Sequence, residues 1–348
     1  NKDGEADFYE NFCDLIETSR NGHDYVTSLE KDRNGNFYFV DPVGAHRVSP
    51  DGSRMETLAS GFRNPNGLGV DDSGSIITVA PQQGEWTPSS VICEIRSGGY
   101  YGYPGPKTTL ERPLGFDPPL CYIPHSIDNS SGSQAWIPVG HWGVLGQQAI
   151  HLAWGRCTAM LLLRDTSSSI PQGATVPLPV HFLSGPDRAV FREADDSLYV
   201  VGSTGWQTSA TKDGCFQRVR LTGKPVDVPV HWRAVEKGLQ IASPMALDPK
   251  TAADPGSFSL KQWNYRYQAE YGSKDWSVAH PDKTGRDKLE VSAASLSRDG
   301  RTITLSAAIQ PVNQMEISYN VDTASGETLR GQLWLTLNAV PKSSLAAP

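Results

Sequence analysis

Several features that mark common protein classes are scarce or missing in this chain of 348 residues. Its longest apolar run, residues 159–163, has the length of a buried strand and falls far short of the roughly 18 residues of a membrane span. The net charge of −7 leaves no basic excess, which argues against a nucleic-acid-binding surface. We therefore expect neither a membrane span nor a nucleic-acid partner.

Cysteine is sparse as well. The five cysteines are Cys13, Cys93, Cys121, Cys157 and Cys215, and their spacing contains no C-x-x-C pair and no C-x-x-C-H haem motif. This spacing argues against a structural zinc site and against covalent haem. The odd count leaves at least one thiol unpaired within the chain, and the spacing does not decide whether the others form one disulfide, two or none.

What the chain has in quantity is turn-forming residues, with 33 Gly and 25 Pro. Hydrophobic residues make up 38% and charged residues 20%, and the blend of Ala, Leu, Glu and Lys typical of helical proteins is missing. This composition, together with many Trp and Tyr residues, predicts an all-β fold.

A polar turn followed by an apolar strand recurs along the chain. The three clearest copies are DRNGNFYFV from Asp32, DSGSIITV from Asp72 and DDSLYVVG from Asp195. The first two lie about 40 residues apart and the third about three such steps further on, which is the period of β-propeller blades. A β-sandwich built of hairpins is the alternative.

The two ends of the chain differ from this pattern. We expect an N-terminal segment at 1–20 that resembles the remnant of a calcium loop, propeller blades at 21–281, and a small C-terminal β unit with a tail at 282–348. Strands are predicted there at 289–292, 302–305, 315–319 and 332–337. Because at most five blades can be counted, we expect another chain or a further segment to complete the ring.

The stretch from Gly61 to Gly105 holds more polar residues than a blade requires. Arg63-Asn64 stands directly before Pro65, a Gln82-Gln83-Gly84-Glu85 loop follows one strand, and Tyr101-Gly102-Tyr103-Pro104 closes the unit. Strands and turns alone would not need these residues, so we interpret them as parts of a site.

The order of these three motifs resembles the soluble pyrroloquinoline quinone (PQQ)-dependent aldose and sorbosone dehydrogenases, which are six-bladed β-propellers. The resemblance extends from about His23 to Gly223, and the β unit after about Asp282 resembles the tail of sugar-dehydrogenase-like propellers of planctomycete type. It implies a calcium site at Gln83, Gly84 and Glu85, in which oxygen ligands suit a hard cation. A hydrogen-bonded loop without metal is the alternative.

The resemblance also implies roles for four other residues. His23 would be the catalytic base that takes a proton from the sugar hydroxyl, because imidazole titrates near neutral pH. Arg63, Asn64 and Arg188 would bind the PQQ cofactor, because guanidinium groups match carboxylate geometry. The alternatives are a blade-edge histidine and an Arg-Asn pair that merely ties a turn.

Two departures from the family pattern weaken the case for PQQ. The position of a second channel arginine falls on Pro186, and Gly155 or Arg156 stands where the family has a lysine. A tricarboxylate cofactor needs cationic partners, and a site without two of them would bind it poorly.

Aromatic and histidine residues supply further candidates. Ten aromatic residues are expected near the rim of the channel, more than half of them buried and a few left exposed for stacking on a sugar. They are Trp86, Tyr101, Tyr103, Trp142, Trp206, Trp263, Tyr265, Tyr267, Tyr271 and Trp276. His125, His141 and His151 could form a metal site, but we interpret them as unrelated surface histidines.

These observations predict a secreted, extracellular or periplasmic protein that acts on a carbohydrate small molecule or glycan. The first hypothesis is a sugar oxidoreductase that passes hydride from an aldose-type hydroxyl to PQQ, with calcium. The alternative is a lyase, a hydrolase or a carbohydrate-binding propeller that has lost the quinone chemistry.

Overall fold

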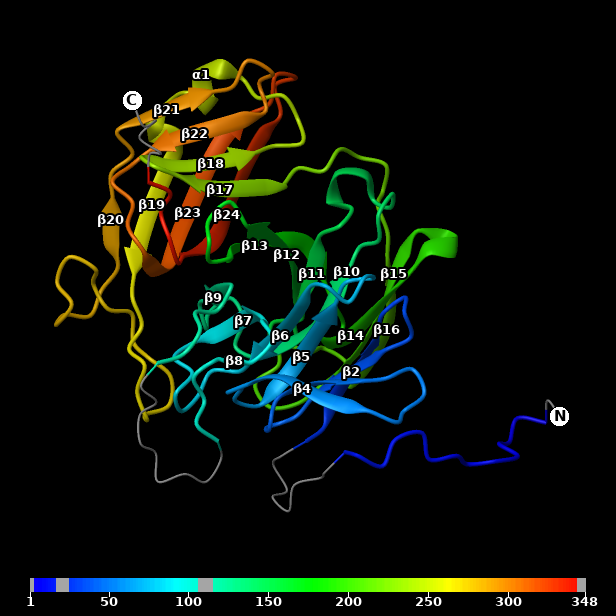
Figure 1. Cartoon of the computed structure of the whole chain (residues 1–348). Helices are drawn as coiled ribbons and strands as arrows, with labels where there is room; N and C mark the ends of the chain where they lie inside the picture. The colour runs from blue at the N-terminus through cyan, green and yellow to red at the C-terminus, as the bar shows by residue number, and fades with distance from the viewer. Residues whose placement is uncertain (1–2, 17–24, 106–114, 343–348) are drawn as a thin grey trace, which may run out of the picture.

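The structure of the protein is a computed structural model that describes residues 3–16, 25–105 and 115–342 (Figure 1). Nearly all regular elements in these ranges are β-strands. The helical elements there are α1 (Pro249–Ala252) and three 3-10 turns, η1 (Gly143–Leu145), η2 (Glu193–Asp195) and η3 (Pro255–Ser257). The predicted all-β fold is confirmed.

Four successive segments of the chain each form a sheet of antiparallel strands that we call a blade. Blade 1 comprises β1 (Thr27–Lys31), β2 (Phe37–Val40), β3 (Ala45–Val48) and β4 (Met55–Ser60). Blade 2 comprises β5 (Pro65–Val70), β6 (Ile77–Pro81), β7 (Ser90–Glu94) and β9 (Cys121–Ile123), while β8 (Gly99–Tyr100) adds to the edge of blade 1 through β4.

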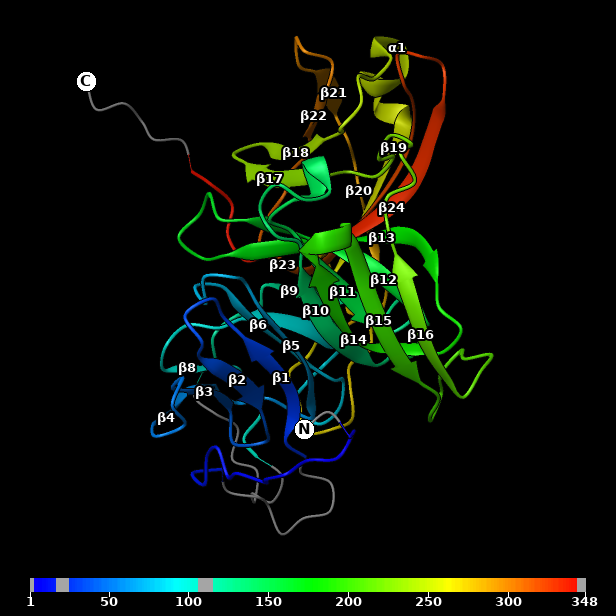
Figure 2. The same ribbon diagram turned by 90° about the vertical axis from the view of Figure 1, so that its right-hand side faces the viewer.

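Blade 3 comprises β10 (Ser131–Trp136), β11 (Ala149–Ala153), β12 (Thr158–Asp165) and β13 (Gln172–His181). Blade 4 comprises β14 (Gly185–Arg192), β15 (Ser197–Ser203) and β16 (Gly214–Val219). The first strands are neighbours, because β5 contacts both β1 and β10, and β10 contacts β14. Figure 2 shows the blades following one another from blue to green around these strands, the arrangement of a β-propeller.

The recurring turns introduce the second strand of a blade. In blade 1, Asp32 accepts hydrogen bonds from the backbone N–H of Asn36 (2.9 Å) and from the hydroxyl of Tyr38 (2.9 Å). In blade 2, Asp71 accepts one from the N–H of Ile76 (2.7 Å). Carboxylates that bind nearby N–H groups favour turns over continued strand. The predicted turn-plus-strand repeat therefore corresponds to β2, β6 and β15.

The rest of the chain forms a C-terminal unit. Its strands are β17 (His231–Val235), β18 (Gly238–Ala242), β19 (Phe258–Trp263), β20 (Asp287–Leu289), β21 (Ala293–Leu296), β22 (Thr302–Ser306), β23 (Val312–Asp322) and β24 (Thr328–Leu337). Three of the four predicted strands match β22, β23 and β24, whereas 289–292 falls at the break between β20 and β21. Strand pairing crosses the predicted limit at residue 282, because β18 pairs with β22. The domain ranges themselves stay predictions.

This unit is joined to blade 3 by a continuous sheet. β24 pairs with β13 at Ala174–Leu335 and Thr175–Trp334, so that blade 3 extends through β24, β23, β19 and β20. One hydrophobic cluster also spans blade 3, blade 4 and the unit. Fully buried Trp232 of β17 lies in this cluster, and its Nε1 donates to the carbonyl of Leu163 in β12 at 3.2 Å. The unit therefore shares the propeller core.

We expect the Trp232→Ala substitution to lower the free energy of unfolding by about 3–5 kcal/mol, because it empties a large site in the shared core. Trp232→Phe, which keeps an aromatic ring but loses the hydrogen bond to Leu163, should cost less. Urea unfolding of the three proteins tests this ranking. Equal stability of the alanine variant and the wild type would contradict a shared core.

Buried Asp165 ties the unit to blade 3 through the N–H of Ala234 (2.9 Å) and binds the side chain of Gln172 (3.0 Å). Burial opposes ionisation, but hydrogen bonds from Ser167, Gln172 and Ala234 outweigh it and lower the pKa of Asp165.

The lowered pKa of Asp165 makes the stability of the fold depend on pH. A carboxyl whose pKa is lower in the folded state than in the unfolded state stabilises the fold at pH values above its unfolded pKa of about 4. This stabilisation is lost as the pH falls through the folded-state pKa. Asp165→Asn should therefore flatten the loss of unfolding free energy below about pH 5, measured by urea unfolding at several pH values.

Candidate functional site

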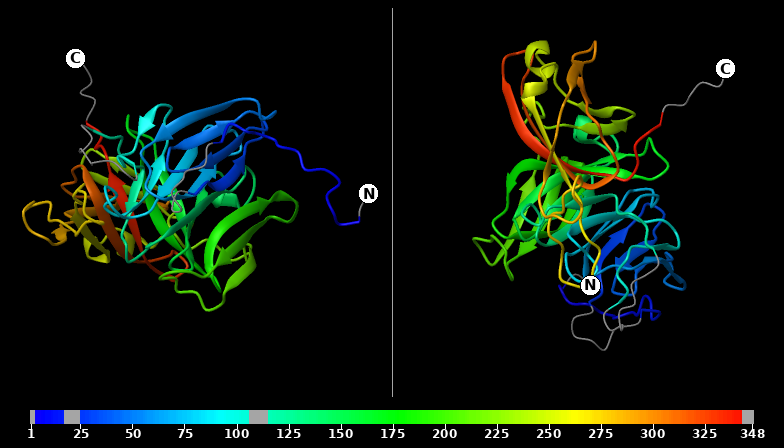
Figure 3. Two further views of the ribbon diagram at one scale, coloured as in Figure 1. Left: turned by 90° about the horizontal axis from the view of Figure 1, so that it is seen from below. Right: turned by 90° about the vertical axis from the view of Figure 1, so that its left-hand side faces the viewer.

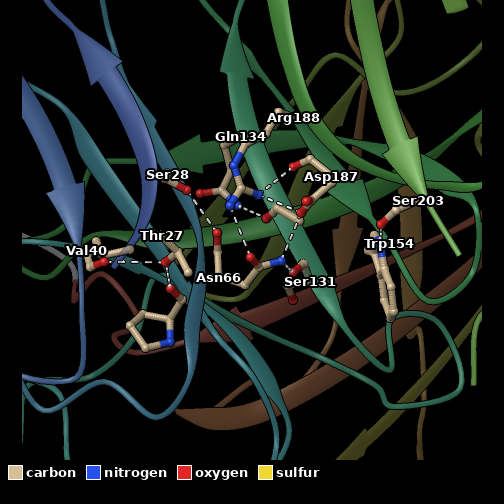
Figure 4. A network of polar contacts seen from close by, with 12 residues as sticks. Thr27, Ser28, Val40, Asn66, Ser131, Gln134, Trp154, Asp187, Arg188 and Ser203 are labelled. Carbon is tan, nitrogen blue, oxygen red and sulfur yellow. Dashed lines mark hydrogen bonds and ion pairs between the residues drawn. The ribbon is translucent and has the colours of Figure 1, made fainter. Parts of the chain in front are cut away.

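Polar side chains from the first strands of the four blades meet near the starts of these strands (Figure 4). Asn66 of β5 donates from Nδ2 to the carbonyl of Ser131 (3.0 Å) and to Asp187 Oδ1 (3.1 Å). Arg188 of β14 donates to Asn66 Oδ1 (3.1 Å) and to Asp187 Oδ1 (2.6 Å). Ser28 of β1 donates to the Asn66 carbonyl (2.9 Å). We call this set the axial network.

Glu30 of β1 faces the axial network. Burial raises the pKa of its carboxyl to about 7, against the lowering effect of the Arg188 charge. A carboxyl that titrates near neutral pH can accept a proton under working conditions. Glu30 is therefore a candidate proton acceptor that the sequence motifs did not indicate.

A second cluster gathers around Arg63, which directly precedes the first strand of blade 2. Its Nε donates to Glu85 Oε2 at 2.8 Å and its Nη1 to the carbonyl of Gln83 at 2.9 Å. A Cβ on Gly84 would lie 1.9 Å from Arg63 Nε, so the guanidinium packs directly on backbone that only glycine leaves open. The Arg-Asn motif and the Gln-Gly-Glu loop are thus brought together, as their order suggested.

The oxygen atoms of this loop that would coordinate calcium do not fit the calcium site expected there. The oxygens of Gln83 and Glu85 already bind Arg63, and the Gly84 carbonyl accepts hydrogen bonds from the N–H groups of Thr87 (3.1 Å) and Gly272 (3.0 Å). A guanidinium therefore occupies the position that a cation would need. Among the residues that the structure describes, no group of three or more His, Cys, Asp and Glu side chains could hold a metal ion.

The arginines expected to bind PQQ are also engaged. Arg63 is paired with Glu85, and Arg188 with Asp187 at 2.6 Å. A tricarboxylate needs cationic groups without internal carboxylate partners, so this arrangement does not fit the quinone. Asn64 is exposed, with a left-handed backbone (φ 39°), and it is Asn66, two residues later, that enters the axial network. His23 lies outside the described residues.

A cleft of about 990 Å³ opens on the face where the loops between second and third strands gather. The lining is aromatic, amide-rich and weakly charged: Gln82, Gln83, His125, Asn129, Ser130, Trp154, Trp206, Gln207, Gln268, Tyr271, Gly272, Ser273 and Lys274.

Two aromatic rings of this lining are exposed. Trp206 is 83% exposed and Tyr271 64% exposed. These two rings confirm the expectation that a few aromatics remain exposed, and Trp86, Trp142 and Trp263 are buried as expected for the majority.

Trp154 of the β11–β12 turn is held rigidly beside the axial network (Figure 4). Its Nε1 donates to the hydroxyl of Ser203 at 3.2 Å. A Cβ on Gly185 would approach Trp154 Cδ1 to 2.8 Å, and one on Gly205 would approach Cη2 to 2.6 Å. Two glycines thus leave room for the indole, which fixes this wall of the cleft.

The opposite wall comes from the C-terminal unit. The excursion between β19 and β20, residues 264–286, reaches down beside blade 2, as the yellow segment of Figure 3 (right) shows. The N–H of Ser273 donates to the Pro88 carbonyl (2.9 Å), and that of Trp86 to the Gln268 carbonyl (2.9 Å). Loops far apart in sequence therefore build one cleft, and no local motif indicated this.

The three candidate metal-binding histidines have separate partners. Buried His151 binds Asp128 (2.8 Å), His141 binds Asp196 (2.9 Å), and His125 lines the cleft. Burial and the charge of Arg156 lower the pKa of His125. His141 and His151 thus bind different carboxylates. The expected surface position is wrong for His151, which is fully buried because its ring forms an ion pair with buried Asp128 inside blade 3.

No protein-family model matches the chain, and no curated protein sequence is similar to it. A search of solved structures finds glucose dehydrogenases that are similar to part of the chain. One is an oxidoreductase (glucose dehydrogenase) from Thermus thermophilus, 15% identical over 55% of this chain and 63% of the other, with a TM-score of 0.40. Two glucose dehydrogenases are 16% and 17% identical over 56% of this chain, each with a TM-score of 0.42. This chain spans less than two thirds of the length of all three.

In the part of the chain that the structure describes, no helix is long and apolar enough to cross a membrane.

We expect Arg188→Gln to raise the pKa of Glu30 above about 7, because the substitution removes the positive charge that opposes the effect of burial. A ¹³C NMR titration of labelled glutamate carboxyls measures this shift. Arg192→Gln serves as the control. It removes an exposed arginine that lies on β14, like Arg188, and that pairs with Asp195 of η2. A Glu30 titration near the ordinary value of about 4.3 would contradict the burial argument.

Proposed function

We propose that this propeller-type protein binds a carbohydrate in the cleft between Trp154 and Tyr271. The observation that carries the proposal is the combination of exposed aromatic rings with amide side chains on one concave surface. Sugar rings have apolar C–H faces that pack on indole and phenol rings, and their hydroxyls exchange hydrogen bonds with amides. A large exposed ring such as Trp206 is otherwise costly to leave in water.

The fixed position of Trp154 supports the same proposal. A ring already held by Ser203, Gly185 and Gly205 loses little conformational freedom when a ligand packs on it. Aromatic side chains anchored in this way carry much of the binding energy in recognition sites.

Substituting Trp206→Ala should weaken binding of the best saccharide by at least about tenfold, equivalent to about 1.4 kcal/mol. The ligand is first chosen by screening a panel of neutral and acidic oligosaccharides, and affinity is then measured by isothermal titration calorimetry. Phe216→Ala is the matched control, because Phe216 is 72% exposed and lies outside the cleft lining. Unchanged affinity in the Trp206 variant, or equal loss in both, would refute the proposed site.

Oxidation of the bound sugar is a second candidate function, favoured by Glu30. Glu30 does not line the cleft, so this candidate requires a sugar hydroxyl that reaches the axial network. There a carboxyl with a pKa of about 7 could take the hydroxyl proton while a separate acceptor takes hydride. The test is reduction of an artificial electron acceptor over the sugar panel, with and without added PQQ and Ca²⁺. Sugar-dependent reduction that falls in Glu30→Gln supports this candidate, and no turnover with any sugar leaves the protein as a binder.

A further inference from the structure

Charge is distributed unevenly around the cleft. Its lining contains no Asp or Glu side chain, although the whole chain carries 38 acidic residues and a net charge of −7. The lining does contain the exposed ammonium of Lys274 and the imidazole of His125. A cleft without carboxylates in an acidic protein repels anions less than the rest of the surface does.

Nearby carboxylates are already paired. Glu85 binds Arg63 at 2.8 Å, and Asp275, next to Lys274, binds Arg286 at 2.7 Å. Glu270 belongs to the same excursion but does not line the cleft. The positive charge of Lys274 is therefore left facing the cleft with little opposing charge from the lining.

A second cation lies behind the lining. Arg156 donates from Nη2 to the carbonyl of His125 at 3.2 Å, and its buried Nε has no hydrogen-bond partner among the described residues. Burial lowers the pKa of His125, the Arg156 charge lowers it further, and the charge of Asp128 opposes both, so Arg156 is the cation that acts on this side of the cleft. A buried donor without a partner is costly, and a ligand or water oxygen would relieve that cost.

We propose that the cleft selects saccharides that carry a carboxylate, such as oligomers of a hexuronic acid. The sugar ring packs on Trp206 or Tyr271 while its carboxylate pairs with Lys274 in the positive field of Arg156. A single carboxylate matches this site, whereas a tricarboxylate would need the arginines that are already paired. This inference rests on the proposed function, because it names the substrate class of the same cleft.

The test compares oligogalacturonides with their methyl esters, in which each carboxylate is replaced by a neutral ester and the sugar rings are unchanged. The free acid should bind at least about fivefold more tightly at low salt, and the preference should shrink as salt screens the exposed Lys274. Lys274→Gln should remove most of the preference, measured as the ratio of acid affinity to ester affinity in the same variant. Lys237→Gln, at the exposed β17–β18 turn, is the charge-matched control and should keep the preference.

The outcomes separate this inference from the proposed function. If acid and ester bind equally and Trp206→Ala weakens both, the sugar site stands and the charge selection is overturned. If neither binds and no other saccharide does, the proposed function itself fails. A sulfated oligosaccharide of equal charge that binds more tightly than the uronate would overturn the carboxylate assignment.

Discussion

The architecture depends on satisfying the hydrogen bonds of polar groups where four first strands converge. An amide, a carboxylate and a guanidinium meet there, and each must find partners because water has limited access. The partners of Asn66 and Arg188 come from β1, β5, β10 and β14, so the network holds only when all four blades are correctly placed. The network therefore adds directional polar contacts to the apolar packing that also joins neighbouring blades.

The cleft depends in turn on how the C-terminal unit is attached. Pairing of β24 with β13 and burial of Trp232 against blade 3 fix the unit, and its excursion between β19 and β20 then reaches the loops of blade 2. One wall of the cleft is thus built by propeller strands and the other by an element outside the blades. Neither part alone forms the binding surface.

The recurring turns and the strands that follow them could be predicted from the sequence. Asp32 and Asp71 form these turns by accepting hydrogen bonds from residues only a few positions away. The meeting of Arg63 with the Gln83–Glu85 loop could also be predicted, since both flank one hairpin, β5 to β6. What the sequence could not indicate is that Arg63 itself would take the position expected for a cation. Nor could spacing place Tyr271 and Trp154 in the lining of one cleft, because that arrangement depends on strand pairing between distant segments.

Residues 268–273 of the excursion, next to Lys274, make backbone hydrogen bonds to Gly84, Trp86 and Pro88 of blade 2, and Tyr267 packs on Trp86. Such contacts open locally at lower free energy than a buried core. A ligand that bridges the two walls would be bound only while the excursion stays on blade 2. Bound ligand must therefore slow hydrogen exchange of the backbone amides that join the excursion to blade 2. Conversely, if the excursion separated from blade 2, a long polymer could leave the cleft through the gap between the two walls without being threaded out.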